Sequence, residues 1–274
     1  MKHLLLYINL YFLSIANLLA QDIQMNLNVQ NSIQGKFNIF NIDELGSSYV
    51  LTSGGQIKKY TANTDSLAVF NDAKRYGQLH SIHTENSLRT LLFFKNFNTA
   101  VLLDRMMQVV QKIDLRKLGL FQVSAIAPSY DNRLWLFDQQ NNRIKKIDFD
   151  GSLVFESSDL RLIFDDVMQP HKMIEHQGSL YLLDSLSGVY IFDYYGGFKK
   201  KIHLSHVSDI QSWGDALIGK QGEKFFIKGE NDVDIKWMSI PNQVQHAKQL
   251  YFSRRVLYAL YDDKISLYSF TFKP

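Results

Sequence analysis

Two stretches of the sequence decide the fold: "DQQNNRIKKIDFDG" (Asp138–Gly151) and "DSLSGVYIFDYYGG" (Asp184–Gly197). Each starts with an aspartate, passes through a polar turn, rises into an apolar strand, reaches a second aspartate and ends at a glycine. The second stretch begins 46 residues after the first. A pattern that returns at such a distance indicates a repeat architecture, in which each repeat is one supersecondary unit.

The repeat extends along the chain. Apolar strands of the "LWLFD" kind occur six times, and their second residues are spaced by 43, 43, 46, 36 and 41 positions. These anchor residues are Tyr49, Leu92, Trp135, Tyr181, Leu217 and Tyr258. Each unit holds four short strands separated by polar turns, which is typical of a propeller blade. A β-sandwich would also have short strands, but without a fixed period. The sequence therefore predicts an all-β, six-bladed β-propeller with four-stranded blades.

A propeller must also close. The last repeat has only three strands, whereas "DIQMNLNV" (Asp22–Val29) is an alternating strand that precedes the first repeat. An unpaired strand edge is a site of aggregation. We therefore expect the N-terminal strand to complete the last blade. We also expect the aromatic anchors Trp135, Tyr181 and Tyr258 to pack between neighbouring blades.

The N-terminus resembles an export signal. A short basic start precedes an apolar run, Leu4–Leu19, and the small residue Ala20 follows it. This is the layout of a secretory signal peptide, and the run is shorter than the roughly 20 residues that span a bilayer. The alternative is a membrane anchor. We expect residues 1–21 to be removed, residues 22–274 to form a single propeller, and the mature chain to have no transmembrane span.

Composition narrows the function. The chain is 46% hydrophobic with a net charge of +3, so it is neither disordered nor basic enough to indicate nucleic-acid binding. It contains no cysteine, which excludes a lipoprotein anchor and thiolate chemistry. An exported chain without cysteine suits a bacterial periplasm. We expect a periplasmic or outer-membrane-associated protein, monomeric by itself.

The run "LWLFDQQNNRIKKIDFDG", followed by "LYLLDSLSGVYIFDYYGG", resembles the six-bladed propellers of the NHL-repeat and TolB-like group. The likeness is best in the third and fourth repeats and weakest in the last two. It implies the architecture of about 250 residues and little about function, because such propellers include scaffolds, lyases and lactonases. A more distant likeness is to the eight-bladed propeller lipoprotein of outer-membrane protein assembly, whose lipid-bearing cysteine this chain lacks.

Chemistry is harder to find in the sequence. Asp138 and Asp184 recur with the repeat, so we expect them to accept hydrogen bonds in turns. The inner strands carry few acids, of which Asp209 and Glu175 are clear, so we expect neither calcium nor another metal, and no cofactor. Histidines and charged residues at the starts of the inner strands are candidates for a binding site at the channel rim: His80, His171, Lys172, Asp209, His246 and Lys248.

Two functions fit these observations. The favoured hypothesis is a non-catalytic propeller of the cell envelope that binds a protein or peptide partner as a scaffold. The alternative is a hydrolase or lyase that acts on a sugar or lactone at the central channel. Convergence of His80, His171 and His246 around one pocket would favour the enzyme.

Overall fold

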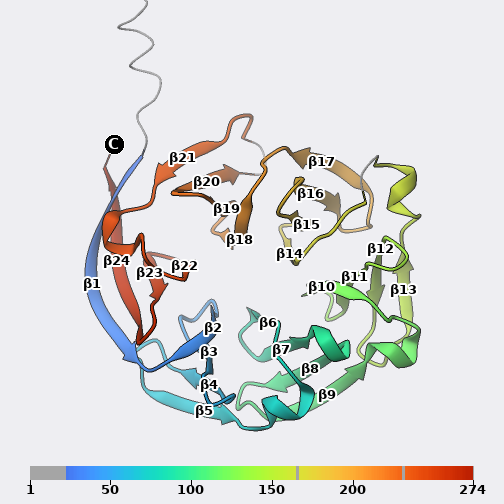
Figure 1. Cartoon of the computed structure of the whole chain (residues 1–274), viewed down its shortest axis with the longest axis horizontal. Coiled ribbons are helices and arrows are strands. Elements are labelled where there is room, and N and C mark those ends of the chain that lie inside the picture. The colour runs from blue at the N-terminus through green and yellow to red at the C-terminus, as the bar shows by residue number, and fades with distance from the viewer. Residues whose placement is uncertain (1–22, 165–166, 230–231, 274) are drawn as a thin grey trace, which may run out of the picture.

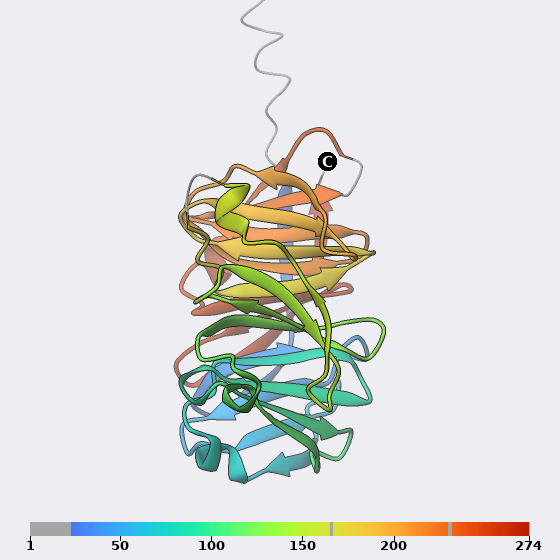
Figure 2. The same ribbon diagram turned by 90° about the vertical axis from the view of Figure 1, so that its right-hand side faces the viewer.

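The computed structural model of the chain describes residues 23–164, 167–229 and 232–273. These residues form a ring of six four-stranded antiparallel sheets, seen face-on in Figure 1 and edge-on in Figure 2. The predicted six-bladed β-propeller is confirmed. The predicted signal peptide, residues 1–21, lies outside the described residues.

Within blades 1 to 3 the strands follow one another from the channel to the outer edge of the ring. Blade 1 comprises β2 (Phe37–Ile42), β3 (Ser48–Thr52), β4 (Ile57–Tyr60) and β5 (Ser66–Phe70). Blade 2 comprises β6 (Ser81–Asn86), β7 (Arg89–Phe94), β8 (Thr99–Asp104) and β9 (Val109–Asp114). Blade 3 comprises β10 (Val123–Pro128), β11 (Leu134–Asp138), β12 (Arg143–Ile147) and β13 (Leu153–Glu156).

Blades 4 and 5 repeat this order, and blade 6 departs from it. Blade 4 comprises β14 (Lys172–His176), β15 (Ser179–Asp184), β16 (Gly188–Asp193) and β17 (Phe198–Ile202). Blade 5 comprises β18 (Val207–Trp213), β19 (Ala216–Gln221), β20 (Lys224–Gly229) and β21 (Lys236–Ser239). Blade 6 comprises β22 (Gln249–Ser253), β23 (Val256–Leu260), β24 (Lys264–Lys273) and β1 (Gln24–Gln34).

The outermost strand of blade 6 is therefore the first strand of the chain. β1 pairs antiparallel with β24 from Gln24 to Gln34, which confirms the predicted closure and lengthens the predicted strand. Figure 1 shows this blue strand lying along the red end of the chain. Ile23 adds a parallel bridge to Met238 of blade 5. The N-terminal segment thus fastens blade 6 and its neighbour.

The described part of the ring contains short 3₁₀ turns. Four of them lie in connections between blades and one lies within blade 2: η1 (Asp72–Tyr76), η2 (Lys95–Phe97), η3 (Leu115–Leu118), η4 (Leu160–Leu162) and η5 (Asn242–Val244). No helix in the described part of the chain has the length and apolar character needed to cross a membrane.

The core lies between the blades. Each of six buried clusters draws its side chains from two neighbouring blades, as expected when sheets stack around a ring. Trp135, Tyr181 and Tyr258 are buried in three of these clusters, each facing the next blade, which confirms their predicted packing. The anchors Leu92 and Leu217 were assigned wrongly, because each lies one residue out of register and faces the preceding blade instead.

The repeated aspartates hold turns, as predicted. The Asp138 side chain accepts a hydrogen bond from the backbone N–H of Asn141 and pairs with Lys145. The Asp184 side chain accepts from the backbone N–H groups of Leu186 and Gln169. These carboxylates satisfy turn donors and are not available to a ligand.

Candidate functional site: the central channel

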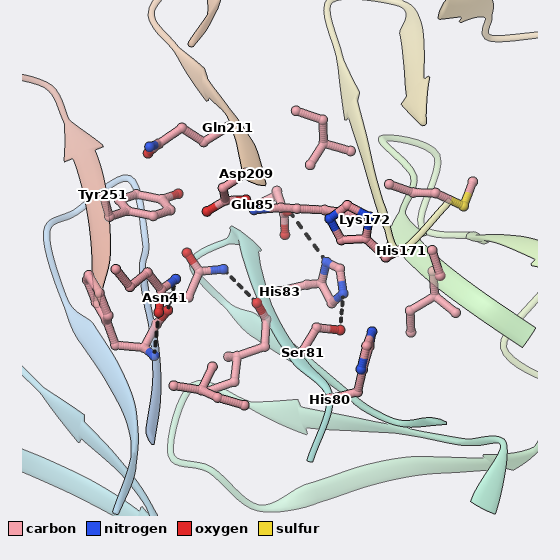
Figure 3. Close-up of a pocket in the computed structure, with 18 of the residues that line it drawn as sticks. Asn41, His80, Ser81, His83, Glu85, His171, Lys172, Asp209, Gln211 and Tyr251 are labelled. Atoms are coloured by element: carbon pink, nitrogen blue, oxygen red, sulfur yellow. Dashed lines mark hydrogen bonds and ion pairs between the residues drawn. The ribbon is translucent and has the colours of Figure 1, made fainter. Parts of the chain in front are cut away.

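The six inner strands, β2, β6, β10, β14, β18 and β22, surround a channel that holds a cavity of about 230 Å³. All six blades contribute to its lining. Figure 3 shows polar and ionisable side chains from five of them gathered around this cavity. This concentration of polar groups makes the channel the candidate functional site.

Equivalent positions along the inner strands form layers of the channel wall, because alternate residues of a strand point to the same side. Pairing with the second strand of each blade identifies these positions. The first layer consists of Ile39, Ser81, Ala125, Lys172, Asp209 and Gln249. The second layer consists of Asn41, His83, Ala127, Ile174, Gln211 and Tyr251. The six blades carry six different residues in each layer, so the repeat that specifies the fold is not kept at the channel wall.

Three amides of these layers bind the neighbouring blade. Gln211 accepts from the Phe252 N–H at 2.8 Å and donates to the Leu250 carbonyl. Gln249 forms the same pair of hydrogen bonds with the backbone N–H and C=O of Phe40. Asn41 donates to the carbonyl of Ile82. Their partners are backbone groups of the next inner strand, so these amides join blades 5, 6, 1 and 2.

The polar side chains of β6 are arranged differently. Ser81, His83 and Glu85 are alternate residues of one strand and form a row (Figure 3). The Ser81 Oγ lies 2.8 Å from His83 Nε2, and His83 Nδ1 lies 3.7 Å from Glu85 Oε1. The His83 side chain is 6% exposed, whereas that of Glu85 is 36% exposed. The row therefore runs from the cavity through a buried imidazole to a carboxylate that remains in contact with solvent in the channel.

A β-bulge places the last member of this row. The register of β6 against β7 shifts between His83 and Asn86, which releases Glu85 from the regular ladder. Bulges bend a strand and redirect a side chain, and they are common beside functional sites. Enclosure in the channel acts to raise the pKa of Glu85, but contact with His83 and the charge of Lys172 outweigh it and hold that pKa below its ordinary value.

His80 and His171 line the same cavity from blades 2 and 4. Burial lowers the pKa of His80, and the charge of Lys95 lowers it further. Burial also lowers the pKa of His171, against the opposing charge of Asp209. Both rings are therefore neutral donors and acceptors at neutral pH.

An ion pair and a phenol complete the wall. Lys172 Nζ lies 2.6 Å from Asp209 Oδ1 and joins the inner strands of blades 4 and 5. Tyr251 projects into the channel (Figure 3). Burial raises the pKa of Tyr251, and the carboxylates of Glu85 and Asp209 raise it further, so its hydroxyl keeps its proton.

The structure brings together four of the six residues predicted for the site. His80, His171, Lys172 and Asp209 line the central cavity. Lys248 pairs with Asp262 and lines a neighbouring cavity of about 350 Å³. His246 is exposed in the turn after η5, apart from the two other histidines. The convergence of all three histidines that would favour the enzyme is therefore not found, because only His80 and His171 line the central cavity.

Sequence reasoning missed the row on β6. Glu85 was overlooked as an acid of the inner strands, and His83 was not among the site residues predicted from the sequence. The alternation in "SIHTE" (residues 81–85) was the available signal, because it places a hydroxyl, an imidazole and a carboxylate on one face of a strand. Only the structure shows that this face is turned toward the channel.

The channel opens at one end into a wide mouth, a cavity of about 890 Å³. The turns between the first and second strands of the blades surround it. Leu88 and Tyr130 line it and are 66% and 69% exposed, and Trp213 is half-buried beside them. The exposed Glu44 and the carboxylate of Glu85 also line it. In contrast, Asp43 is buried and accepts hydrogen bonds from its own turn.

Among the described residues, no group of three or more histidine, aspartate or glutamate side chains is arranged to hold a metal ion. This finding covers the described residues of the channel, His80 and His171 among them.

Comparison with known proteins identifies the architecture alone. No protein-family model and no curated protein matches the chain by sequence. Among solved structures, virginiamycin B lyase from Staphylococcus aureus is 17% identical over 84% of this chain and 79% of that chain, with a TM-score of 0.59. The Pan2 WD40 domain of Neurospora crassa is 10% identical over 86% of this chain and 89% of that chain, with a TM-score of 0.53. PorZ of Porphyromonas gingivalis, a surface component of the type-IX secretion system, is 11% identical over 87% of this chain and 32% of its own, with a TM-score of 0.60.

Proposed function

We propose that the protein is an exported β-propeller of the bacterial envelope that binds a protein partner at the wide mouth of its channel. The observation that carries this proposal is the 890 Å³ cavity, bordered by the exposed side chains of Leu88 and Tyr130. Exposed apolar and aromatic groups around a cavity are typical of a binding surface. The proposed export rests on the N-terminal 21 residues of the sequence.

The chemistry of the mouth selects the bound segment. Tyr130 and Trp213 offer aromatic surface, and Leu88 offers an aliphatic contact. Glu44 and Glu85 favour a positive charge at the same place. The partner therefore inserts a loop or chain end that carries an apolar side chain next to a lysine or arginine.

A peptide-display experiment tests this proposal. A library of random peptides is selected on the mature protein, and the affinities of the selected peptides are measured by fluorescence anisotropy. We expect peptides that combine apolar and basic residues, and we expect Leu88→Asp to weaken their binding at least 10-fold. The matched control is Leu186→Asp. Leu186 is 74% exposed, but it lies in a turn between second and third strands, on the face of the ring opposite to the wide mouth.

Three outcomes would contradict the proposal. No peptide would be selected, or the selected peptides would bind the Leu88→Asp variant unchanged, or the two variants would lose affinity equally. Glu44→Lys separates charge from apolar contact. It should weaken the basic peptides more at low ionic strength than at high ionic strength, because exposed charges are screened by salt.

A second candidate function is hydrolysis within the channel, the alternative that the sequence also allowed. The specific observation in its favour is the row of Ser81, His83 and Glu85.

A further inference from the structure

The row on β6 has the order of groups found in nucleophilic hydrolases. A serine hydroxyl contacts one imidazole nitrogen, and a carboxylate lies beside the other nitrogen. We propose that Ser81 is the nucleophile of an acyl-transfer site in the channel, that His83 is its general base and that Glu85 positions the His83 ring. The substrate class is a small carboxylic ester or lactone. This assignment rests on the second candidate function, hydrolysis in the channel, and does not depend on partner binding at the wide mouth.

The fold itself does not require these polar groups. The positions of Ser81 and His83 in blade 3 are held by Ala125 and Ala127, which are buried in a blade of the same geometry. An imidazole buried at the His83 position costs free energy unless its nitrogens are satisfied. Here they are satisfied by Ser81 and approached by Glu85, and not by the neighbouring blade. The two direct contacts of this row therefore lie within β6 and do not join two blades.

The Ser81 hydroxyl is placed where a substrate can reach it. Ser81 lines the central cavity and is partly exposed, and His83 lines the same cavity but is buried. A serine, an imidazole and a carboxylate arranged in this way are recognised by their geometry and roles on many unrelated folds. The distance of 3.7 Å between His83 and Glu85 is long for a hydrogen bond, and contacts of this kind tighten when substrate binds.

The cavity determines the size and polarity of the substrate. Its volume of about 230 Å³ holds a molecule of modest size. Ile82, Ile126 and Met173 provide an apolar wall for an acyl group. His171 and Lys172 line the same cavity from blade 4. They are the donors that can stabilise negative charge on the carbonyl oxygen of an ester.

The reaction balances with water as the second substrate. The proton of the Ser81 hydroxyl moves to His83 Nε2 as the Oγ attacks the carbonyl carbon. The bond from that carbon to the alkoxy oxygen then breaks, and His83 gives its proton to the departing alkoxide. Water next gives a proton to His83 and attacks the acyl-serine. The bond between Oγ and the acyl carbon breaks, the carboxylic acid leaves, and Ser81 recovers its proton from His83.

Covalent labelling tests the nucleophile. The mature protein is treated with a fluorophosphonate, which phosphonylates activated serines, and the modified residue is located by mass spectrometry of peptides. We expect a single adduct on Ser81, and we expect none on the Ser81→Ala variant. The matched control is Ser208→Ala, because Ser208 lines the same cavity but donates to the carbonyl of Lys220. It should label as the unmodified protein does.

Ester hydrolysis tests the roles of the three groups. With p-nitrophenyl acetate and butyrate as probes, we expect Ser81→Ala and His83→Gln to lower kcat at least 100-fold, the usual contribution of a general base. Glu85→Gln should lower kcat about 10-fold and change KM less than twofold, because a positioning residue acts on the base and not on substrate binding. Melting curves for each variant show whether it is folded.

The proposal is overturned if the folded protein takes up no fluorophosphonate, or if Ser81→Ala hydrolyses the esters at more than half the original rate. An adduct on Ser208 in place of Ser81 would overturn it as well. An unchanged kcat in Glu85→Gln would overturn the role of that carboxylate. These results are distinguishable from failure of the partner-binding proposal, because neither probe is a peptide.

Discussion

Gln211 on β18 and His83 on β6 occupy the same layer of the channel wall, yet they bind different partners. Gln211 holds the backbone of β22 through two hydrogen bonds, so it joins blade 5 to blade 6. His83 contacts Ser81 and Glu85 of its own strand. A polar residue in this layer can therefore serve the ring or remain available for chemistry. Its partners, and not its position, distinguish the two roles.

The difference leads to opposite expectations for mutation. Removal of a group that holds two blades together should lower the stability of the fold. Removal of a group of the β6 row should lower activity instead. The four predictions below test the structural side of this comparison, from the largest effect to the smallest.

The largest effect should follow from removal of β1. A chain that begins at Gln34 lacks Met25, Leu27 and Ile33, all buried against blades 5 and 6 or blade 1. Burial of each such side chain stabilises by about 1.5–3 kcal/mol, and whole domains are stable by about 5–15 kcal/mol. We expect this chain to aggregate or to melt far below one that begins at Asp22. Equal melting temperatures in a thermal scan of the two would show that the ring closes without β1.

Trp135→Ala should have the next largest effect. Trp135 is fully buried between blades 3 and 4, where its indole donates to Glu175 and packs under the Lys146 ammonium at 4.6 Å. Truncation of a buried aromatic costs about 3–5 kcal/mol. Urea denaturation measures the loss, and Trp135→Phe is the control, since it keeps most of the ring and should cost less. A loss below about 1 kcal/mol for the alanine variant would contradict the packing of these two blades.

The fold and the site differ in how far they can be predicted from the sequence. Trp135 and Tyr181 repeat because every blade must bury the same face, so their spacing predicts the ring. The register predicted for Leu92 was wrong, because the neighbouring residues of its strand are also apolar and the sequence does not distinguish them. A shift of one position moves a side chain to the opposite face of a strand. The alternation of Ser81, His83 and Glu85 is visible in the sequence, but a single sequence does not reveal that this face is turned toward the channel, nor the bulge that releases Glu85.

The two hydrogen bonds of Gln211 to β22 give the most direct test of the comparison between Gln211 and the β6 row. Gln211→Ala leaves the N–H of Phe252 and the carbonyl of Leu250 without their side-chain partner in a buried place. An unsatisfied buried group costs about 1–3 kcal/mol. Ser81→Ala, one layer away on β6, removes a hydroxyl that binds no other blade, and we expect it to cost less than about 1 kcal/mol. If urea denaturation reversed this order, the division between joining groups and the β6 row would be wrong.

The smallest effect concerns pH. His80 and His171 have pKa values below the ordinary value of 6.5, chiefly because of burial. Between those lowered values and 6.5, the unfolded chain binds more protons than the folded one, so stability rises with pH in this range. The stabilisation is complete above about pH 6.5 and is lost as the pH falls toward the folded-state pKa values.

We expect the melting temperature to fall by about 2–4 °C from pH 7.5 to 5.5, which corresponds to about 1 kcal/mol in a domain of this size. The double variant His80→Gln and His171→Gln should remove most of that fall, whereas His246→Gln should retain it, because His246 is exposed in its turn. An identical pH dependence in all three proteins would mean that the burial of the two rings in the channel has no energetic consequence for the fold.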